Sequence, residues 1–144
     1  MTQHTKNMVS IRLLSGGHSF SSRDTCGVTS REGVTIELCT HKTTLVPAAM
    51  LNASDASCHL RAVGLAPAID ETVVCSTEVN GVVAVMAISS ECHDHVARQF
   101  VCGFSYSSPL LVAEPPVEGS VLSLYGDTLY VAVYRSGLCF AEAM

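Results

Sequence analysis

The dipeptide Asn80-Gly81 separates two runs rich in β-branched and apolar residues, 71–79 and 82–89. Asn-Gly between two such runs is the strongest short-range signal for a β-hairpin, because both central residues of the tight turn need a positive φ. The longest apolar run of the chain, 81–88, lies in this segment and has the length of a strand. We therefore expect an antiparallel β-hairpin at 71–89.

Four further segments are predicted to be strands. Residues 8–14 and 34–41 alternate between apolar and polar residues, and the weaker, polar segment 18–24 lies between them after a Gly-Gly turn. We expect these three to form an antiparallel meander. Residues 109–114 are predicted as a short strand.

The C-terminal residues 120–144 contain three short β-runs joined by Gly126-Asp127 and Ser136-Gly137. Turn dipeptides at this spacing predict a second β-meander. An isolated meander has too little core to be stable alone. We therefore expect it to pack on a partner: its own domain, a second copy, or another protein.

Two helices are predicted. Residues 54–65 begin at a possible cap, Ser54, and end at Gly64, and residues 89–100 begin at Ser89 or Ser90. The inward-facing residues of the second helix are predicted to be Cys92, Val96 and Phe100. Before the first helix, Pro47 fits either the first turn of a short helix or a break after an extended segment.

The charge of the chain argues against two classes of partner. The formal net charge is −5, and the eight Lys and Arg residues form no run. Nucleic-acid and anionic-membrane surfaces need clustered cations, so we expect neither partner. No signal peptide or membrane-length apolar segment is visible, and we predict a cytoplasmic protein without membrane insertion. The seven cysteines include no CxxC pair, and we expect reduced, mostly buried thiols.

The order of the predicted elements, β-β-β-α-β-β-α-β followed by a β-meander, resembles the ribonuclease-H-like half of the actin-like ATPase superfamily. More narrowly, the chain resembles an uncharacterised bacterial family with an actin-like ATPase fold. The segments that carry the resemblance are VSIRLLSGGHSF (9–20), HKTTLVPAAML (41–51), SPLLVAE (108–114) and LYVAVYRSGLCF (129–140). It implies a mixed-sheet α+β fold, with a half-domain at 1–114 and the truncated start of a second half at 119–144.

The resemblance also implies where a phosphate-binding loop would lie. Its counterpart here is formed by Ser15, Gly16, Gly17 and Ser19. Members of the superfamily carry an acidic residue at the end of the first strand, which organises magnesium, whereas this chain has Ser15 there and no carboxylate in residues 1–23. We therefore expect a hairpin turn, no catalytic residues, no cofactor and no ATP hydrolysis. The same absence argues against a two-metal nuclease.

Two groups of residues suggest a metal site, and we expect neither to form one. His93 and His95 are two positions apart on a predicted helix, about 200° around its axis, so they cannot share a metal. We expect them on a solvated helix face. The other group matches no zinc-finger spacing and consists of Cys39, His41, Cys58 and His59.

The aromatic residues of the C-terminal meander are the functional hint that we weigh most. Tyr130 and Tyr134 fall on one side of a predicted strand and alternate with Val131 and Val133, with Tyr125 in the preceding run. An exposed aromatic strip on an edge strand would be a contact surface.

We therefore expect a non-enzymatic interaction or scaffold module. It would form a homodimer through residues 119–142, or bind an unidentified protein partner. The alternative is a degenerate nucleotide or small-ligand binder that uses the Ser15-Gly16-Gly17 turn.

Overall fold

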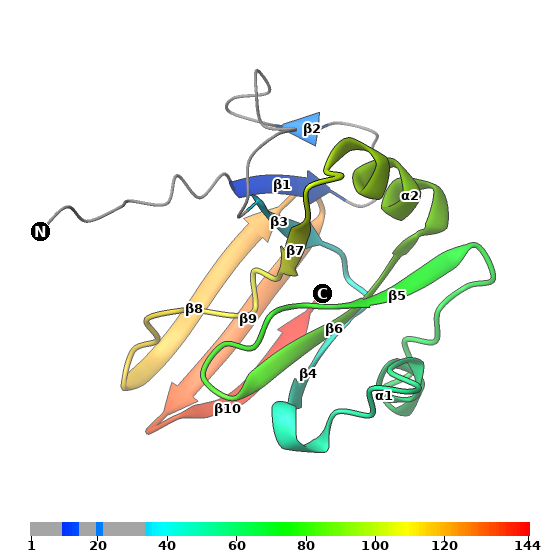
Figure 1. Cartoon of the computed structure of the whole chain (residues 1–144). Helices are drawn as coiled ribbons and strands as arrows, with labels where there is room; N and C mark the ends of the chain where they lie inside the picture. Colours follow the sequence, from blue (N-terminus) through cyan, green and yellow to red (C-terminus); the bar gives the residue numbers. More distant parts are fainter. Residues whose placement is uncertain (1–9, 15–19, 22–33) are drawn as a thin grey trace, which may run out of the picture.

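The computed structural model describes residues 10–14, 20–21 and 34–144, and these form three β-sheets with two α-helices (Figure 1). The α+β class with mixed strand directions is as predicted. The elements are β1 (Ser10–Leu14), β2 (Phe20–Ser21), β3 (Val34–Cys39), β4 (Thr43–Pro47), the short 3-10 helix η2 (Ala48–Met50), α1 (Ser57–Ala62), β5 (Glu71–Cys75), β6 (Val82–Ser89), α2 (Ser90–Gln99), β7 (Phe104–Ser107), β8 (Glu118–Tyr125), β9 (Thr128–Arg135) and β10 (Leu138–Ala143).

The first sheet has the strand order β2-β1-β3-β7. β1 and β2 are antiparallel, but β3 runs parallel to both β1 and β7. The predicted antiparallel meander of three strands is therefore wrong. Alternation of apolar and polar residues shows that a segment is a strand with two unlike faces, but it carries no information about the direction of the neighbour.

The second sheet contains the predicted hairpin and has the order β4-β6-β5. Asn80 has φ 50° and Gly81 has φ 78°, the pair of positive values that a type I′ turn requires. The segment 43–47 is a strand, β4, that lies antiparallel to β6 and ends at Pro47, opposite Val82. Both readings of Pro47 are met in part: it ends the extended segment β4, and it is the residue that immediately precedes the short helix η2.

The core lies on both faces of β6. On one face, Ala84, Met86 and Ile88 pack against side chains of β3, α2 and β7; on the other, Val85 and Ala87 pack against Leu60 of α1. β6 is thus buried on both sides, which explains why its sequence is apolar without alternation.

Both predicted helices are present, with different accuracy at their ends. α2 begins as expected: the Cys92 N–H donates to Ser89 Oγ at 3.2 Å, and Val96 and Phe100 are buried. α1 is shorter than predicted and begins after Ala56, without a side-chain cap. Ser54 does not cap it, because both its N–H and its hydroxyl donate to Asn52 Oδ1.

The strand predicted at 109–114 is wrong, and β7 lies a few residues before it. The apolar character of 109–114 reflects burial without strand pairing: Leu110 is fully buried, although it lies in a turn. β7 is hard to recognise from sequence because its four residues include two serines, and its one long strand neighbour, β3, lies far away in the chain.

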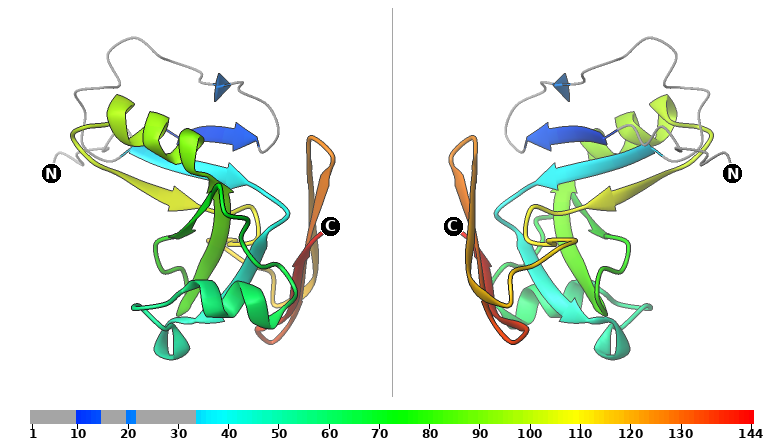
Figure 2. Two further views of the ribbon diagram at one scale, coloured as in Figure 1. Left: turned by 90° about the vertical axis from the view of Figure 1, so that its right-hand side faces the viewer. Right: turned by 90° about the vertical axis from the view of Figure 1, so that its left-hand side faces the viewer.

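The third sheet is the C-terminal meander, with the order β10-β9-β8 and antiparallel pairing throughout. Both predicted turns are confirmed, and each contains a residue of positive φ: Gly126 in the first, Ser136 and Gly137 in the second. This sheet forms a layer at one side of the molecule, with one face toward the other sheets and one face away from them (Figure 2). The predicted division into 1–114 and 119–144 stays a prediction.

The cysteines are less buried than predicted. In the described residues Cys39 is buried, Cys58 and Cys92 are half-buried, and the remaining three are exposed, namely Cys75, Cys102 and Cys139. None of these six forms a disulfide. Cys26 lies outside the described residues. Within the described part of the chain, no helix is both long and apolar enough to span a membrane.

Candidate functional site

The inner face of the C-terminal sheet anchors it to the rest of the chain. Tyr130 and Tyr134 of β9 are only 1% and 5% exposed, and Tyr130 packs in a cluster with Cys39 and Leu110. β9 is also the central strand of its sheet. The predicted exposed aromatic strip on an edge strand is therefore wrong. The meander buries its tyrosines against its own chain, because an isolated sheet cannot leave both apolar faces in water.

Tyr130 carries an unusual buried group on this inner face. Burial raises the pKa of its hydroxyl, with contributions from the neighbouring Cys39 and Glu37, while Thr128 offsets part of the rise. Yet no hydrogen bond of ordinary length and angle reaches Tyr130 Oη from the described residues. The ring of Tyr125 lies 6.0 Å from the ring of Tyr130, centroid to centroid. The inner face is thus held by apolar packing rather than by a polar site.

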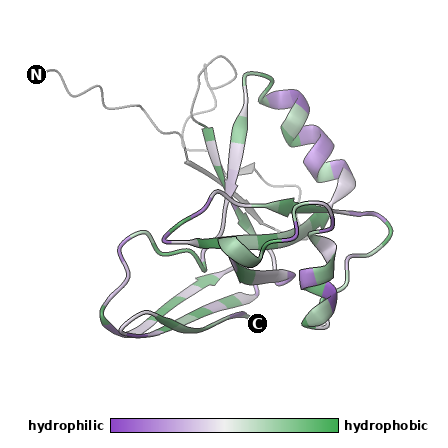
Figure 3. Cartoon of the chain, turned by 60° about the horizontal axis from the view of Figure 1, so that its bottom comes forward, coloured by the Kyte–Doolittle hydropathy of each residue, from purple (hydrophilic) through white to green (hydrophobic). Residues whose placement is uncertain are grey.

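The outer face of the C-terminal sheet is the candidate site. We use this name for nine positions in three cross-strand rows, which follow from the strand register: Ser120, Val133 and Phe140; Leu122, Val131 and Glu142; Leu124, Leu129 and Met144. Seven of the nine are apolar. The exposed fractions are 64% for Leu122, 69% for Leu124, 47% for Phe140 and 55% for Met144. Hydrophobic residues alternate along these strands in Figure 3.

This surface is unusual for a protein monomer. Single exposed apolar residues are common and need no explanation, but a contiguous apolar sheet face marks an interaction surface. The inner face already supplies the contacts that hold the sheet to the chain. Among the described residues, no core cluster includes a side chain of the other face. Val131 and Val133, predicted as interface residues, lie on it, whereas Tyr130 and Tyr134 do not.

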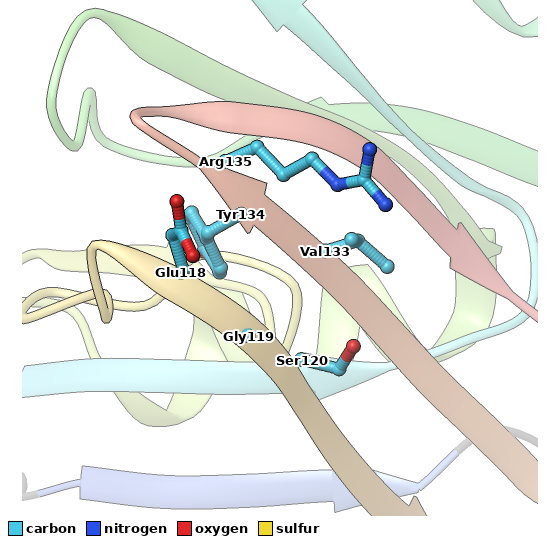
Figure 4. Close-up of a pocket in the computed structure, with 6 residues that line it drawn as sticks. All are labelled: Glu118, Gly119, Ser120, Val133, Tyr134 and Arg135. Carbon is cyan, nitrogen blue, oxygen red and sulfur yellow. The ribbon is translucent and has the colours of Figure 1, made fainter.

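One end of the outer face carries charges of both signs. Glu118 and Arg135 are cross-strand neighbours, and together with Gly119, Ser120, Val133 and Tyr134 they line an open hollow of about 470 Å³ (Figure 4). The two charged side chains point in different directions (Figure 4). The hollow is open to solvent and holds no convergent set of polar groups. It lies at the end of the sheet and is lined from both faces, since Gly119 and Tyr134 belong to the inner one.

The other predicted sites have different outcomes. Ser15, Gly16, Gly17 and Ser19 lie outside the described residues, so the phosphate-loop interpretation stays a prediction. Among the residues that the structure describes, no three His, Cys, Asp or Glu side chains come together as a metal site.

The predicted solvated helix face is only partly correct. His95 is exposed, but His93 is half-buried, and its Nδ1 lies 2.8 Å from Tyr106 Oη. The His93 ring also lies near the ring of Phe104 on β7. The sequence offered no signal for this pair, because β7 was not predicted.

The comparisons with known proteins bear on the fold. No protein-family model and no curated protein matches the chain. Among solved structures, a Bacteroides thetaiotaomicron protein of unknown function is similar over 100% of this chain and 73% of its own, with a TM-score of 0.69 and 14% sequence identity. It has an actin-like ATPase fold. At 14% identity, this likeness shows the fold and not an activity.

A second solved structure is similar at a lower level. It is the cytoplasmic domain of EpsL, an inner membrane component of the type II secretion system of Vibrio cholerae. The match covers 95% of this chain and 70% of that domain, with a TM-score of 0.47 and 14% identity. The fold assignment therefore rests on the Bacteroides structure.

Proposed function

We propose that the chain is a non-enzymatic protein-interaction module on an actin-like ATPase fold, and that it forms a homodimer through its C-terminal sheet, residues 119–142. The observation that carries the proposal is the outer face, where seven of nine positions are apolar. Homodimer interfaces and the buried centres of interfaces in general are more apolar than the rest of a protein surface, and they contain few charged residues. The outer face has this composition, with Glu142 as the one charged residue among its nine positions.

The absence of a carboxylate from residues 1–23 supports the non-enzymatic part of the proposal. Phosphoryl transfer on this fold depends on an acidic residue that holds a divalent cation, and a serine hydroxyl cannot supply that charge. We propose further that the chain is related to the uncharacterised bacterial family whose fold it resembles.

A double variant with a matched control tests the proposal. Leu122→Ser with Phe140→Ser places two hydroxyls on the outer face, one on each outer strand. Met50→Ser with Ile69→Ser makes the same chemical change at two exposed apolar residues away from that face. Light scattering coupled to size-exclusion chromatography measures the mass of each protein over a range of concentrations.

We expect the wild type and the Met50/Ile69 control to be dimeric. The dimer of the Leu122/Phe140 variant should dissociate at protein concentrations at least about tenfold higher than those at which the wild-type dimer dissociates. A wild type that stays monomeric throughout would contradict the homodimer. Equal dissociation of the two double variants would instead show that the dimer does not form through the outer face.

A further inference from the structure

β8 is an edge strand of the C-terminal sheet, and within residues 10–14, 20–21 and 34–144 no strand pairs with its outer side. It is eight residues long, contains no proline or bulge, and has one charged residue, Glu118, at its first position. β10, the opposite edge, has an irregular register between Leu138 and Phe140, carries Glu142, and lies beside β4. Bulges, inward charges and coverage are the usual protections of an edge strand against pairing. β10 has the register shift and the neighbouring strand β4, and β8 has neither.

The hydrogen bonds of β9 show which backbone groups of β8 face outward. The Leu129 N–H donates to Met144 O at 2.7 Å, and the Met144 N–H donates to Leu129 O at 2.8 Å. Leu129 therefore uses its backbone groups toward β10, and its opposite neighbour on β8, Leu124, is not hydrogen-bonded to it. Because this pattern alternates along an antiparallel ladder, the backbone groups of Ser120, Leu122 and Leu124 all face the open edge.

The most exposed apolar side chains of the three strands lie on this same edge. Leu122 and Leu124 are 64% and 69% exposed, compared with 47% for Phe140 on β10. A strand added beside β8 would place its own side chains next to these two leucines on the outer face. The backbone groups of β8 that face the edge and its two exposed leucines therefore fit the same kind of partner, an extended strand.

We propose that β8 pairs antiparallel with β8 of a second copy, which joins the two C-terminal sheets into one of six strands. This rests on the homodimer proposed above and narrows its contact to the β8 edge: Leu122 and Leu124 of the two copies meet there, and the two outer faces join into one continuous apolar surface. In two registers, the outward-facing backbone N–H and C=O groups of the two β8 strands pair with each other over nearly the whole length of the strand. The one that we favour sets Leu122 opposite Leu122 of the second copy, Ser120 opposite Leu124, and Gly119 opposite Tyr125.

The residue opposite Glu118 distinguishes the two registers, since neither of them sets like charges opposite each other. In the favoured register Glu118 lies opposite Gly126 of the second copy, which has no side chain to contact the carboxylate. In the other register, Glu118 would lie opposite the apolar Leu124. Two copies of one strand also match in length and in side-chain alternation, which a two-fold axis requires of a self-complementary contact.

Residue-resolved amide hydrogen exchange of the full chain tests the proposal directly. When the protein is concentrated, we expect the amides of Ser120, Leu122 and Leu124 to exchange about tenfold more slowly, or slower still, than when it is dilute. The Ser123 amide, which faces β9, and the Leu129 amide are internal controls and should not change. A dimer that lacks the alternating protection along β8 would overturn strand pairing while leaving the homodimer intact.

A backbone substitution supplies an independent test. Ser120→Pro removes an N–H that faces the open edge, so the intramolecular ladder keeps all its bonds, and Ser120→Ala is the matched control. We expect the proline variant to weaken the dimer at least tenfold and the alanine variant to leave it unchanged, with circular dichroism confirming that both are folded. Wild-type dimerisation by a folded Ser120→Pro protein would contradict the pairing.

Discussion

Two buried tyrosines illustrate how differently the same residue is used in this molecule. Tyr106 Oη lies 2.8 Å from His93 Nδ1, and its ring packs edge-on against Phe104 at 5.3 Å between centroids. Tyr130 Oη is also buried; its interaction with the Thr128 side chain falls short of an ordinary hydrogen bond, and no other partner reaches it from the described residues. An unpaired buried hydroxyl costs its lost hydration, whereas a paired one recovers most of it. The two hydroxyls therefore contribute with opposite sign to stability.

Removing each hydroxyl in turn tests this difference. We expect Tyr130→Phe to leave the free energy of unfolding unchanged or to raise it by up to about 1 kcal/mol, since the ring packing is kept and an unpaired group is removed. Tyr106→Phe should lower it by about 1 kcal/mol through loss of the contact with His93. Urea unfolding monitored by circular dichroism measures both. A clear loss of stability in Tyr130→Phe would reveal a partner for that hydroxyl.

The half-buried ion pair between Lys42 and Glu71 makes stability depend on pH. Lys42 Nζ lies 2.5 Å from Glu71 Oε1, and the Ala68 N–H donates to the same oxygen at 2.7 Å. Burial alone would raise the pKa of Glu71, but these hydrogen bonds and the lysine charge outweigh it, and the pKa falls below its usual 4.5. A carboxyl group whose pKa is lowered by folding stabilises the protein at pH values above its pKa in the unfolded chain. This stabilisation is lost as the pH falls through the pKa of the group in the folded protein.

We expect Glu71→Gln to lower the free energy of unfolding by about 1 kcal/mol at pH 7, because the amide keeps an acceptor for Ala68 but loses the charge. The difference from the wild type should shrink as the pH falls below 4.5 and protonation removes the same charge from the wild type. Urea unfolding at a series of pH values measures this, with the exposed Glu78→Gln as control. A penalty that persists at pH 2 would contradict the electrostatic origin.

At the scale of elements, the sequence predicted what depends on neighbours in the chain. The β5–β6 hairpin, the capped helix α2 and the two turns of the C-terminal meander each have local chemistry that demands one conformation. β4 and β7 do not. β7 is a strand because it lies beside β3, and β1 is parallel to β3 because of tertiary packing. The partner and the direction of such non-local pairings leave no trace in the periodicity of either strand.

The tight turn between β5 and β6 offers a test at this scale. Gly81 has φ 78°, a conformation that an L side chain adopts only with strain, although no atom would contact an added Cβ. We expect Gly81→Ala to lower the free energy of unfolding by about 1 kcal/mol through backbone strain alone. Asn80→Gly, at the other positive-φ position, should change it by less. Denaturant titration of both variants decides, and equal effects would contradict the assignment of strain to Gly81.

At the scale of the whole molecule, the sequence predicted that the C-terminal sheet carries the candidate site, but it did not predict which face of that sheet is exposed. On β9 the tyrosines alternate with Leu129, Val131 and Val133, so both faces of the strand are apolar and no pattern says which is buried. The structure resolves this through Leu110 and Cys39, which lie far from β9 in the chain and cover the tyrosine side. The outer face could be recognised only once these long-range contacts were known.

The interaction module and the nucleotide binder differ in how the whole molecule responds to ligand. A ligand that binds only the folded state, present at about 100 times its dissociation constant, adds about 2.7 kcal/mol of stability and raises the melting temperature by several degrees. We expect MgATP, MgADP and GTP at millimolar concentration to produce no shift, because the segment that would hold their magnesium has no carboxylate. A saturable shift that Gly16→Val abolishes would instead favour a ligand site at the Ser15-Gly16-Gly17 turn, and the homodimer would then have to be tested with that ligand bound.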